Sequence, residues 1–251
     1  MGALHLGHLS LLETAKKEND VVVVSIFVNP TQFDNKNDLD NYPNTFKEDQ
    51  QLLEAHKCDV LFAPSVNGIY ENNIVSERFD FGGLDKEMEG KFRANHFNGV
   101  ATIVKSLFEI VTPDNAYFGE KDFQQLQIIK KLTAICNFDV IIKGMPIFRE
   151  KNGLAMSSRN ERLSKIQKIA APFIYRVLQY VQQHFSDKNF SEINQFVTNA
   201  FKNHSLLDLE YFVVANENTL KPVKKGESNK NYRAFIAVFA GEIRLIDNIA
   251  L

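Results

Sequence analysis

The chain has 251 residues, of which 44% are hydrophobic and 24% charged, and its formal net charge is -2. This balance argues against a broad electrostatic surface for nucleic acid, and no apolar run approaches the roughly 18 residues of a membrane span. The two cysteines, Cys58 and Cys136, are too few for a disulfide framework. No basic and apolar leader is present either, so we expect a cytoplasmic protein.

Residues 1–145 alternate between short β-branched runs and longer helical patterns. Val21–Val28 is almost continuously apolar, which is typical of a strand buried on both faces. The other predicted strands are Asp59–Phe62, Asn115–Phe118 and Asp139–Ile142, and the predicted helices are Leu9–Lys17, Thr45–His56, Val100–Val111 and Asp122–Cys136. This alternation predicts an α/β fold, a Rossmann-like parallel sheet with right-handed crossovers.

Beyond Pro146 the pattern changes to helices followed by strands. One helix is predicted over Ser164–His184, with Ser164 as its N-cap, and another over Ser191–His204, which begins with a partial capping box. The predicted strands are Leu209–Val214, Tyr232–Phe239 and Glu242–Asn248, with a tight turn at Ala240–Gly241 and a polar loop over Lys224–Asn231. We therefore expect two domains, a parallel-sheet domain over residues 1–147 and a smaller α+β domain over residues 148–251.

The first segment with chemical character is Met1–His8, in which His5 and His8 flank Gly7 at a predicted helix start. The backbone N–H groups and the positive end of a helix dipole favour an anion there, with phosphate the obvious one. Gly7 would let a nucleotide approach the backbone closely. The alternative is two surface histidines on a frayed terminus, and a zinc site is a weaker interpretation because no further ligands complete the set.

Phe118–Gln125 follows a predicted strand, at the edge where open α/β sheets bind ligands. Lys121 supplies a cation, Asp122 is placed to cap the next helix, and Gln125 lies one turn into it. A capped turn with a solvated lysine is the alternative, and by itself the more common one.

In Met156–Asn160, two serines beside Arg159 suit a polyphosphate, although a plain polar loop is the more common explanation for that segment taken alone. Asn29 and Gln32 follow the Val21–Val28 strand and are placed to bind a small polar substrate. His96, in a polar segment before a helix, is either a site group or a capping or packing histidine.

Three of these segments occupy strand-to-helix turns of a parallel sheet, so we expect them to converge on one cleft. None pairs a nucleophilic Ser or Cys with a nearby base, and the chain has neither a Walker A loop nor a G-x-G-x-x-G motif. The remaining His, Lys, Arg and Ser side chains suit stabilisation of a triphosphate during nucleotidyl transfer.

His5–His8 resembles the H-x-G-H signature of the nucleotidyltransferase superfamily shared with class I aminoacyl-tRNA synthetases. Longer segments resemble the pantothenate synthetase (pantoate–β-alanine ligase) family in order and spacing. They are Met1–His8, Ser25–Pro30 with Gln32-Phe33, Asp38-Leu39 with Tyr42-Pro43, His96-Phe97 with Gly99, Gly119–Gln125, Ser157–Asn160 and Leu245–Asn248. The resemblance covers essentially the whole chain and departs from the family pattern at Asn44 and at Ala94-Asn95.

The resemblance implies an ATP-dependent, adenylate-forming ligase of pantothenate biosynthesis. ATP and (R)-pantoate would form pantoyl adenylate and pyrophosphate, and β-alanine would then attack the acyl carbon to give pantothenate and AMP. It also implies a homodimer whose partners are small-molecule substrates, not nucleic acid or membrane. Mg²⁺ would be held mainly by the triphosphate, with Asp49 as a second anchor.

The same resemblance implies individual site residues. Catalytic roles fall to His5, His8, Lys121 and Arg159, and pantoate binding falls to Gln32 and Gln125. ATP would contact Met1, Gly2, Ala3, Leu4, His5, Leu6, Gly7, His8, Gly119, Glu120, Lys121, Asp122, Phe148, Met156, Ser157, Ser158 and Arg159. The alternatives are another H-x-G-H nucleotidyltransferase, including a synthetase fragment, and a truncated, non-catalytic nucleotide-binding form.

The phosphate-binding turn of such a sheet normally follows its first strand, but here the turn begins at Met1. We therefore expect the first strand to be missing, which leaves Val21–Val28 with an open edge. A chain that starts at Met1 is expected to melt lower and to be less active than one extended by an upstream strand.

Overall fold

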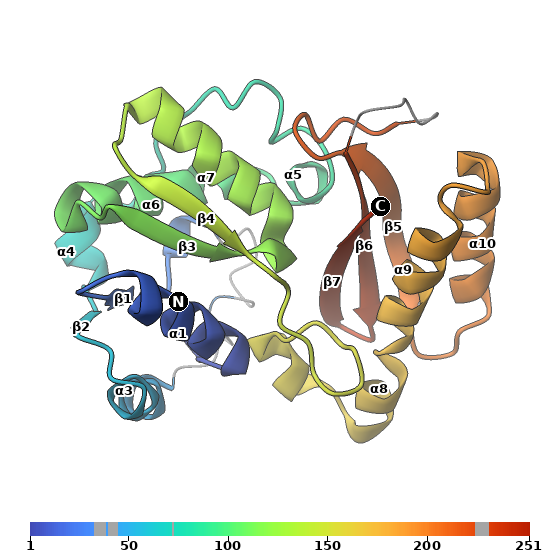
Figure 1. The fold of residues 1–251 in the computed structure, drawn as a ribbon, viewed down its shortest axis with the longest axis horizontal. Coiled ribbons are helices and arrows are strands. Elements are labelled where there is room, and N and C mark those ends of the chain that lie inside the picture. The colour runs from blue at the N-terminus through green and yellow to red at the C-terminus, as the bar shows by residue number, and fades with distance from the viewer. Residues whose placement is uncertain (33–38, 40–44, 72, 224–230) are drawn as a thin grey trace. The chain divides into compact units, whose positions relative to one another are not determined.

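The computed structural model describes residues 1–32, 39, 45–71, 73–223 and 231–251 (Figure 1). Outside the described residues lie Phe33, Asp38 and residues 42–44, which carry part of the family resemblance, and most of the predicted loop Lys224–Asn231. The chain divides into two compact units. Unit 1 comprises Met1–Glu120 and Gln124–Pro146, and unit 2 comprises Lys121–Phe123 and Ile147–Leu251.

The strands of unit 1 form two parallel pairs, which confirms the predicted parallel arrangement. β1 (Val23–Ser25) pairs with β2 (Val60–Phe62), and β3 (Asn115–Gly119) pairs with β4 (Ile141–Met145). Among the described strands no ladder joins the two pairs. Beside β1, the Met1 amino group donates to the Ser25 carbonyl and the Phe27 N–H donates to the Met1 carbonyl.

Two strand predictions for unit 1 were wrong in extent. β1 covers three residues of the predicted Val21–Val28, because the ladder with β2 is only three residues long and Val21 is 63% exposed. β4 starts at Ile141, two residues later than predicted, because its register begins opposite Asn115.

Unit 1 also contains helices, the longer of which bury apolar residues in the clusters that include strand residues. These helices are α1 (Leu6–Glu18), α3 (Phe46–Ala55), α4 (Val66–Tyr70), α5 (Glu89–Phe92), α6 (His96–Val111) and α7 (Phe123–Cys136), with short 3-10 turns η1 (Pro30–Gln32) and η2 (Glu120–Asp122). Leu12 and Ala15 of α1 pack in one core cluster with the β1 strand region. A second cluster joins α6 and α7. α6 begins four residues before the predicted Val100 because His96 and Phe97 are buried on its first turn.

The described residues of unit 2 form helices beside an antiparallel sheet, which agrees with the predicted α+β class. The helices in its described residues are α8 (Lys165–Ala170), α9 (Phe173–His184) and α10 (Phe190–Lys202), after a 3-10 turn η3 (Ser158–Arg162). The sheet has the order β5-β6-β7, with β5 Asp208–Asn216, β6 Tyr232–Ala240 and β7 Ile243–Ala250. In Figure 1, α9 and α10 lie along one face of this sheet, and together they form the core of the unit.

The prediction of one helix over Ser164–His184 was wrong. The helix is interrupted at Pro172, which has no N–H to donate, so α8 ends at Ala170 and α9 starts at Phe173. Ser164 is confirmed as an N-cap, in a full capping box with Gln167. The capping box predicted at Ser191, for the next helix, was placed two residues too late.

The cap of α10 is Asn189, whose side chain accepts the Glu192 N–H while the Glu192 carboxylate accepts the Asn189 N–H. The predicted hairpin between the last two strands is confirmed, since Ala240 pairs with Ile243 and Gly241 has a positive φ of 62°. None of the helices in the described part of the chain is long and apolar enough to cross a membrane.

Candidate active site

The predicted phosphate-binding turn forms the N-terminal end of α1. His5 is the N-cap residue, and its backbone N–H donates to Nδ1 of His8 at 3.3 Å while the His8 N–H donates to the His5 carbonyl at 2.8 Å. The two imidazole rings stack with centroids 3.9 Å apart and an angle of 21° between their planes. Both histidines therefore lie together where the helix dipole and first-turn N–H groups favour an anion.

A buried carboxylate holds this turn in place. Asp49, 2% exposed on α3, accepts the Ala3 N–H at 2.9 Å and the Leu4 N–H at 2.7 Å. The hydroxyl of Thr45 donates to the same carboxylate at 3.2 Å. Ala3 has a positive φ of 50°, which is strained for a residue with a Cβ, and the paired N–H groups stabilise that conformation.

In the structure the two oxygens of Asp49 accept three hydrogen bonds from the protein, and its expected role as a Mg²⁺ anchor stays a prediction. Within the described residues, no group of three or more His, Cys, Asp or Glu side chains is arranged to hold a metal ion. The sequence had one signal for the structural role, an Asp in the first helical turn after Thr45. Its partner Ala3 is 46 residues away, a separation that no local pattern reveals.

We expect Asp49→Asn to lower the melting temperature and to raise the KM for ATP. The amide would direct an NH₂ group at a backbone donor, and an unsatisfied buried group costs about 1–3 kcal/mol. Thermal melting and ATP titration check this, with the exposed neighbour Glu48→Gln as the control. Unchanged melting together with a weaker response to Mg²⁺ would instead make Asp49 a metal ligand.

The loop after β1 is built around the buried amide of Asn29. Its Nδ2 donates to the Gly99 carbonyl at 3.0 Å, and its Oδ1 accepts the Tyr70 hydroxyl at 2.5 Å and the Thr31 hydroxyl at 3.0 Å. Burial raises the pKa of the Tyr70 hydroxyl still further above neutral pH, and the protonated group can donate. Asn29, expected to bind substrate, thus makes these contacts within the protein, and the shape of the loop depends on them.

The next residue of interest in this loop, Gln32, is positioned through its backbone. The Gln32 carbonyl lies 2.9 Å from Nδ1 of His96 and 3.5 Å from Nη2 of Arg93. His96 is buried, so of the two interpretations the sequence left open, these contacts favour the packing histidine. Gly99, one turn into α6, lies directly against Thr31 and leaves no room for a side chain.

Two neighbouring glutamines after β3, Gln124 and Gln125, differ in their surroundings. Gln124 is buried and donates to the carbonyls of Leu84 and Glu87, both at 2.8 Å, while it accepts the Glu89 N–H at 3.0 Å. Gln125 is only partly buried. Gln124 therefore has a structural role, and Gln125 is the better placed of the two for a ligand.

The remaining candidates belong to unit 2. Ser157 caps η3 by accepting the Arg159 N–H at 3.3 Å, and the Met156 N–H donates to the Phe148 carbonyl at 3.0 Å. Of the residues expected to contact ATP, Met1–His8, Gly119 and Glu120 lie in unit 1, whereas Lys121, Asp122, Phe148, Met156, Ser157, Ser158 and Arg159 lie in unit 2. Their convergence on one cleft stays a prediction.

Comparisons with known proteins agree with this architecture. A family model described as pantoate-beta-alanine ligase matches residues 1–250. The chain is 56% identical to pantothenate synthetase of Christiangramia forsetii and 51% identical to that of Flavobacterium psychrophilum, over 100% of this chain and 89% of each relative.

Solved structures are similar as well. Pantothenate synthetase from Thermus thermophilus superposes with a TM-score of 0.93 at 38% identity, over 99% of this chain and 90% of that one. The ligase of Francisella tularensis, solved with beta-gamma ATP and beta-alanine, gives 0.81 at 39% identity, over 100% and 87%. The match along the whole sequence and the shared fold lead to one conclusion: the chain belongs to the pantoate–β-alanine ligase family.

Proposed function

We propose that this chain is an ATP-dependent ligase that joins (R)-pantoate to β-alanine. The observation that carries the proposal is the ordered turn at the start of α1, where His5 and His8 stack at a helix N-terminus. Family membership supports the substrates, and the Francisella tularensis relative was solved with a nucleotide and beta-alanine.

The reaction takes two steps. A pantoate carboxylate oxygen attacks the α-phosphorus of ATP, a P–O bond forms, and the bond to pyrophosphate breaks. The amine of β-alanine then attacks the acyl carbon and loses a proton, and AMP leaves as the acyl–oxygen bond breaks. Since a carboxylate is a poor nucleophile, the protein must supply positioning and charge neutralisation at the phosphates.

His5 and His8 supply donors at the helix start for the phosphates and the leaving pyrophosphate. Lys121 offsets charge on the phosphoryl group under attack, and Ser157, Ser158 and Arg159 bind the β- and γ-phosphates. In this proposal residues 1–147 bind nucleotide and pantoate, and residues 148–251 act as a lid domain. The other expected ATP contacts are the backbone and side chains of Met1–Leu4, Gly119, Glu120, Asp122, Phe148 and Met156.

In this proposal the triphosphate would hold Mg²⁺, which would supply charge neutralisation at the phosphates. Asp49 is the expected second anchor for the ion, and the described residues contain no group of three or more metal-ligating side chains. A homodimer and a cytoplasmic location complete the proposal.

The test is AMP release measured with ATP, pantoate and β-alanine, and with each omitted in turn. AMP release that requires both pantoate and β-alanine supports the proposed ligase activity. AMP or pyrophosphate released with a different acceptor would identify another H-x-G-H nucleotidyltransferase, and binding of ATP without turnover would identify a non-catalytic nucleotide-binding protein.

Gln125→Ala is expected to raise the KM for pantoate far more than that for ATP. A site that hydrogen-bonds a substrate hydroxyl loses about 1–3 kcal/mol when one partner is removed. The matched variant is Gln124→Ala, which removes three protein contacts and should lower the melting temperature. Equal losses for pantoate and ATP in Gln125→Ala would exclude it as a pantoate residue.

A further inference from the structure

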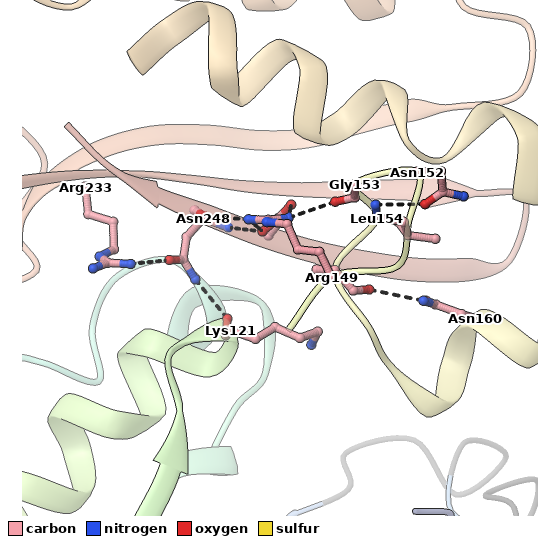
Figure 2. A network of polar contacts seen from close by, with 10 residues as sticks. Lys121, Arg149, Asn152, Gly153, Leu154, Asn160, Arg233 and Asn248 are labelled. Atoms are coloured by element: carbon pink, nitrogen blue, oxygen red, sulfur yellow. Dashed lines mark hydrogen bonds and ion pairs between the residues drawn. The ribbon is translucent and has the colours of Figure 1, made fainter. Parts of the chain in front are cut away.

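The turn that carries Lys121 is attached to the last strand of the chain (Figure 2). Nδ2 of Asn248, on β7, donates to the Lys121 carbonyl at 2.9 Å, across 127 residues of sequence. Asn248 is 2% exposed, so water does not compete for this bond. Lys121–Phe123 accordingly belongs to unit 2, although the chain before and after it belongs to unit 1.

A second contact holds the amide of Asn248 in the orientation this bond needs. Nη1 of Arg233 donates to Oδ1 of Asn248 at 2.6 Å, as Figure 2 shows, which directs Nδ2 toward Lys121. Arg233 is in turn fixed by Glu217, which accepts its Nε–H at 2.8 Å. The Arg233 guanidinium also lies 4.0 Å above the ring of Phe123, so the turn is held at both of its ends.

The backbone around Asn248 is held by hydrogen bonds as well. Its N–H donates to Oδ1 of Asp247 at 2.7 Å, and Asp247 forms a bidentate pair with Arg149 at 2.7 and 2.9 Å. Arg149 also donates to the Gly153 carbonyl at 3.1 Å. Asn248 is therefore built into a network with little freedom to move, as positioning requires.

We propose that Asn248 is a positioning residue for Lys121. Asn248 holds the backbone carbonyl of Lys121, and it thereby fixes the position of the Lys121 ammonium group. An amide suits both tasks here, because one atom must donate to a carbonyl while the other accepts from a guanidinium. This inference rests on the proposed function for the role of Lys121, and on the structure alone for the anchor.

The test uses Asn248→Asp in the full chain. The carboxylate still accepts from Arg233, so the fold is retained, but it places an oxygen against the Lys121 carbonyl. Gln182→Ala is the matched control, because that exposed amide donates to the Ala250 carbonyl of the same strand at 2.7 Å. We expect kcat for pantoyl-adenylate formation to fall about 10- to 100-fold in Asn248→Asp, as for a misplaced catalytic group, with little change in the KM for ATP.

Two further measurements separate positioning from general damage. In a Lys121→Ala background, Asn248→Asp should add almost no further loss, because the two residues act through one group. Hydrogen exchange of the peptide containing Lys121–Phe123 should be faster in Asn248→Asp and unchanged in Gln182→Ala.

Additive losses in the double variant, or unchanged exchange, would overturn the inference. If the unmodified chain has no ligase activity, the proposed function fails and the exchange measurement alone decides whether Asn248 anchors the turn.

Discussion

His8→Ala is expected to slow pantoyl-adenylate formation by about a hundredfold or more, the cost of losing one donor aimed at transition-state charge. The imidazole lies at the start of α1, stacked on His5, and not within an apolar cluster. Its Nδ1 accepts the His5 N–H, so the variant also loses a capping contact worth about 1 kcal/mol. That loss is too small to unfold the chain, and the effect should be on rate.

Pyrophosphate release under saturating ATP and pantoate measures this rate. The control is His56→Ala, on the same unit, whose Nδ1 lies 2.8 Å from the carbonyl of Leu52 at the end of α3. Near-normal turnover in His8→Ala would show that His8 is not a catalytic residue. An equal loss of rate in His56→Ala would indicate general destabilisation.

Gly99→Ala is expected to have the largest effect on stability. A Cβ at this position would lie 2.3 Å from the Thr31 carbonyl oxygen and 2.9 Å from the Cα of Gln32, and both are backbone atoms that cannot rotate away. Separating α6 from the η1 turn would strain the contacts of Asn29 at the same time. Overpacking of this kind costs about 3 kcal/mol, which corresponds to a fall of about 6–12 °C in melting temperature.

The matched variant is Gly119→Ala, because nothing lies within 4 Å of the Cβ it would add. Its melting temperature should stay within about 2 °C of the unmodified chain, since surface-like changes cost about 0.5 kcal/mol or less. A melting temperature of Gly99→Ala equal to that of the unmodified chain would show that α6 and η1 can separate without loss of stability. Gln32 would then not be held by this packing.

Local sequence patterns located most elements because their causes are local. Leu9, Leu12 and Ala15 repeat at helical spacing, and all three are buried on α1. Ser164 and Gln167 form a capping box within four residues of each other. The errors arose where a local rule had competition, as at Pro172, which interrupts the predicted helix, and at Asn189, which caps α10 in place of the nearby Ser191.

By itself, the sequence determined the α/β class, the candidate motifs and, through the resemblance, the family. Only the tertiary structure decided what holds those motifs. Asp49 supports the Ala3–Leu4 turn, Asn29 joins its loop to Gly99, and Asn248 reaches the Lys121 carbonyl across 46, 70 and 127 residues respectively. A buried polar group must be satisfied by some partner, but periodicity and capping signals act only over neighbouring turns. The identity of a distant partner therefore depends on how the elements pack.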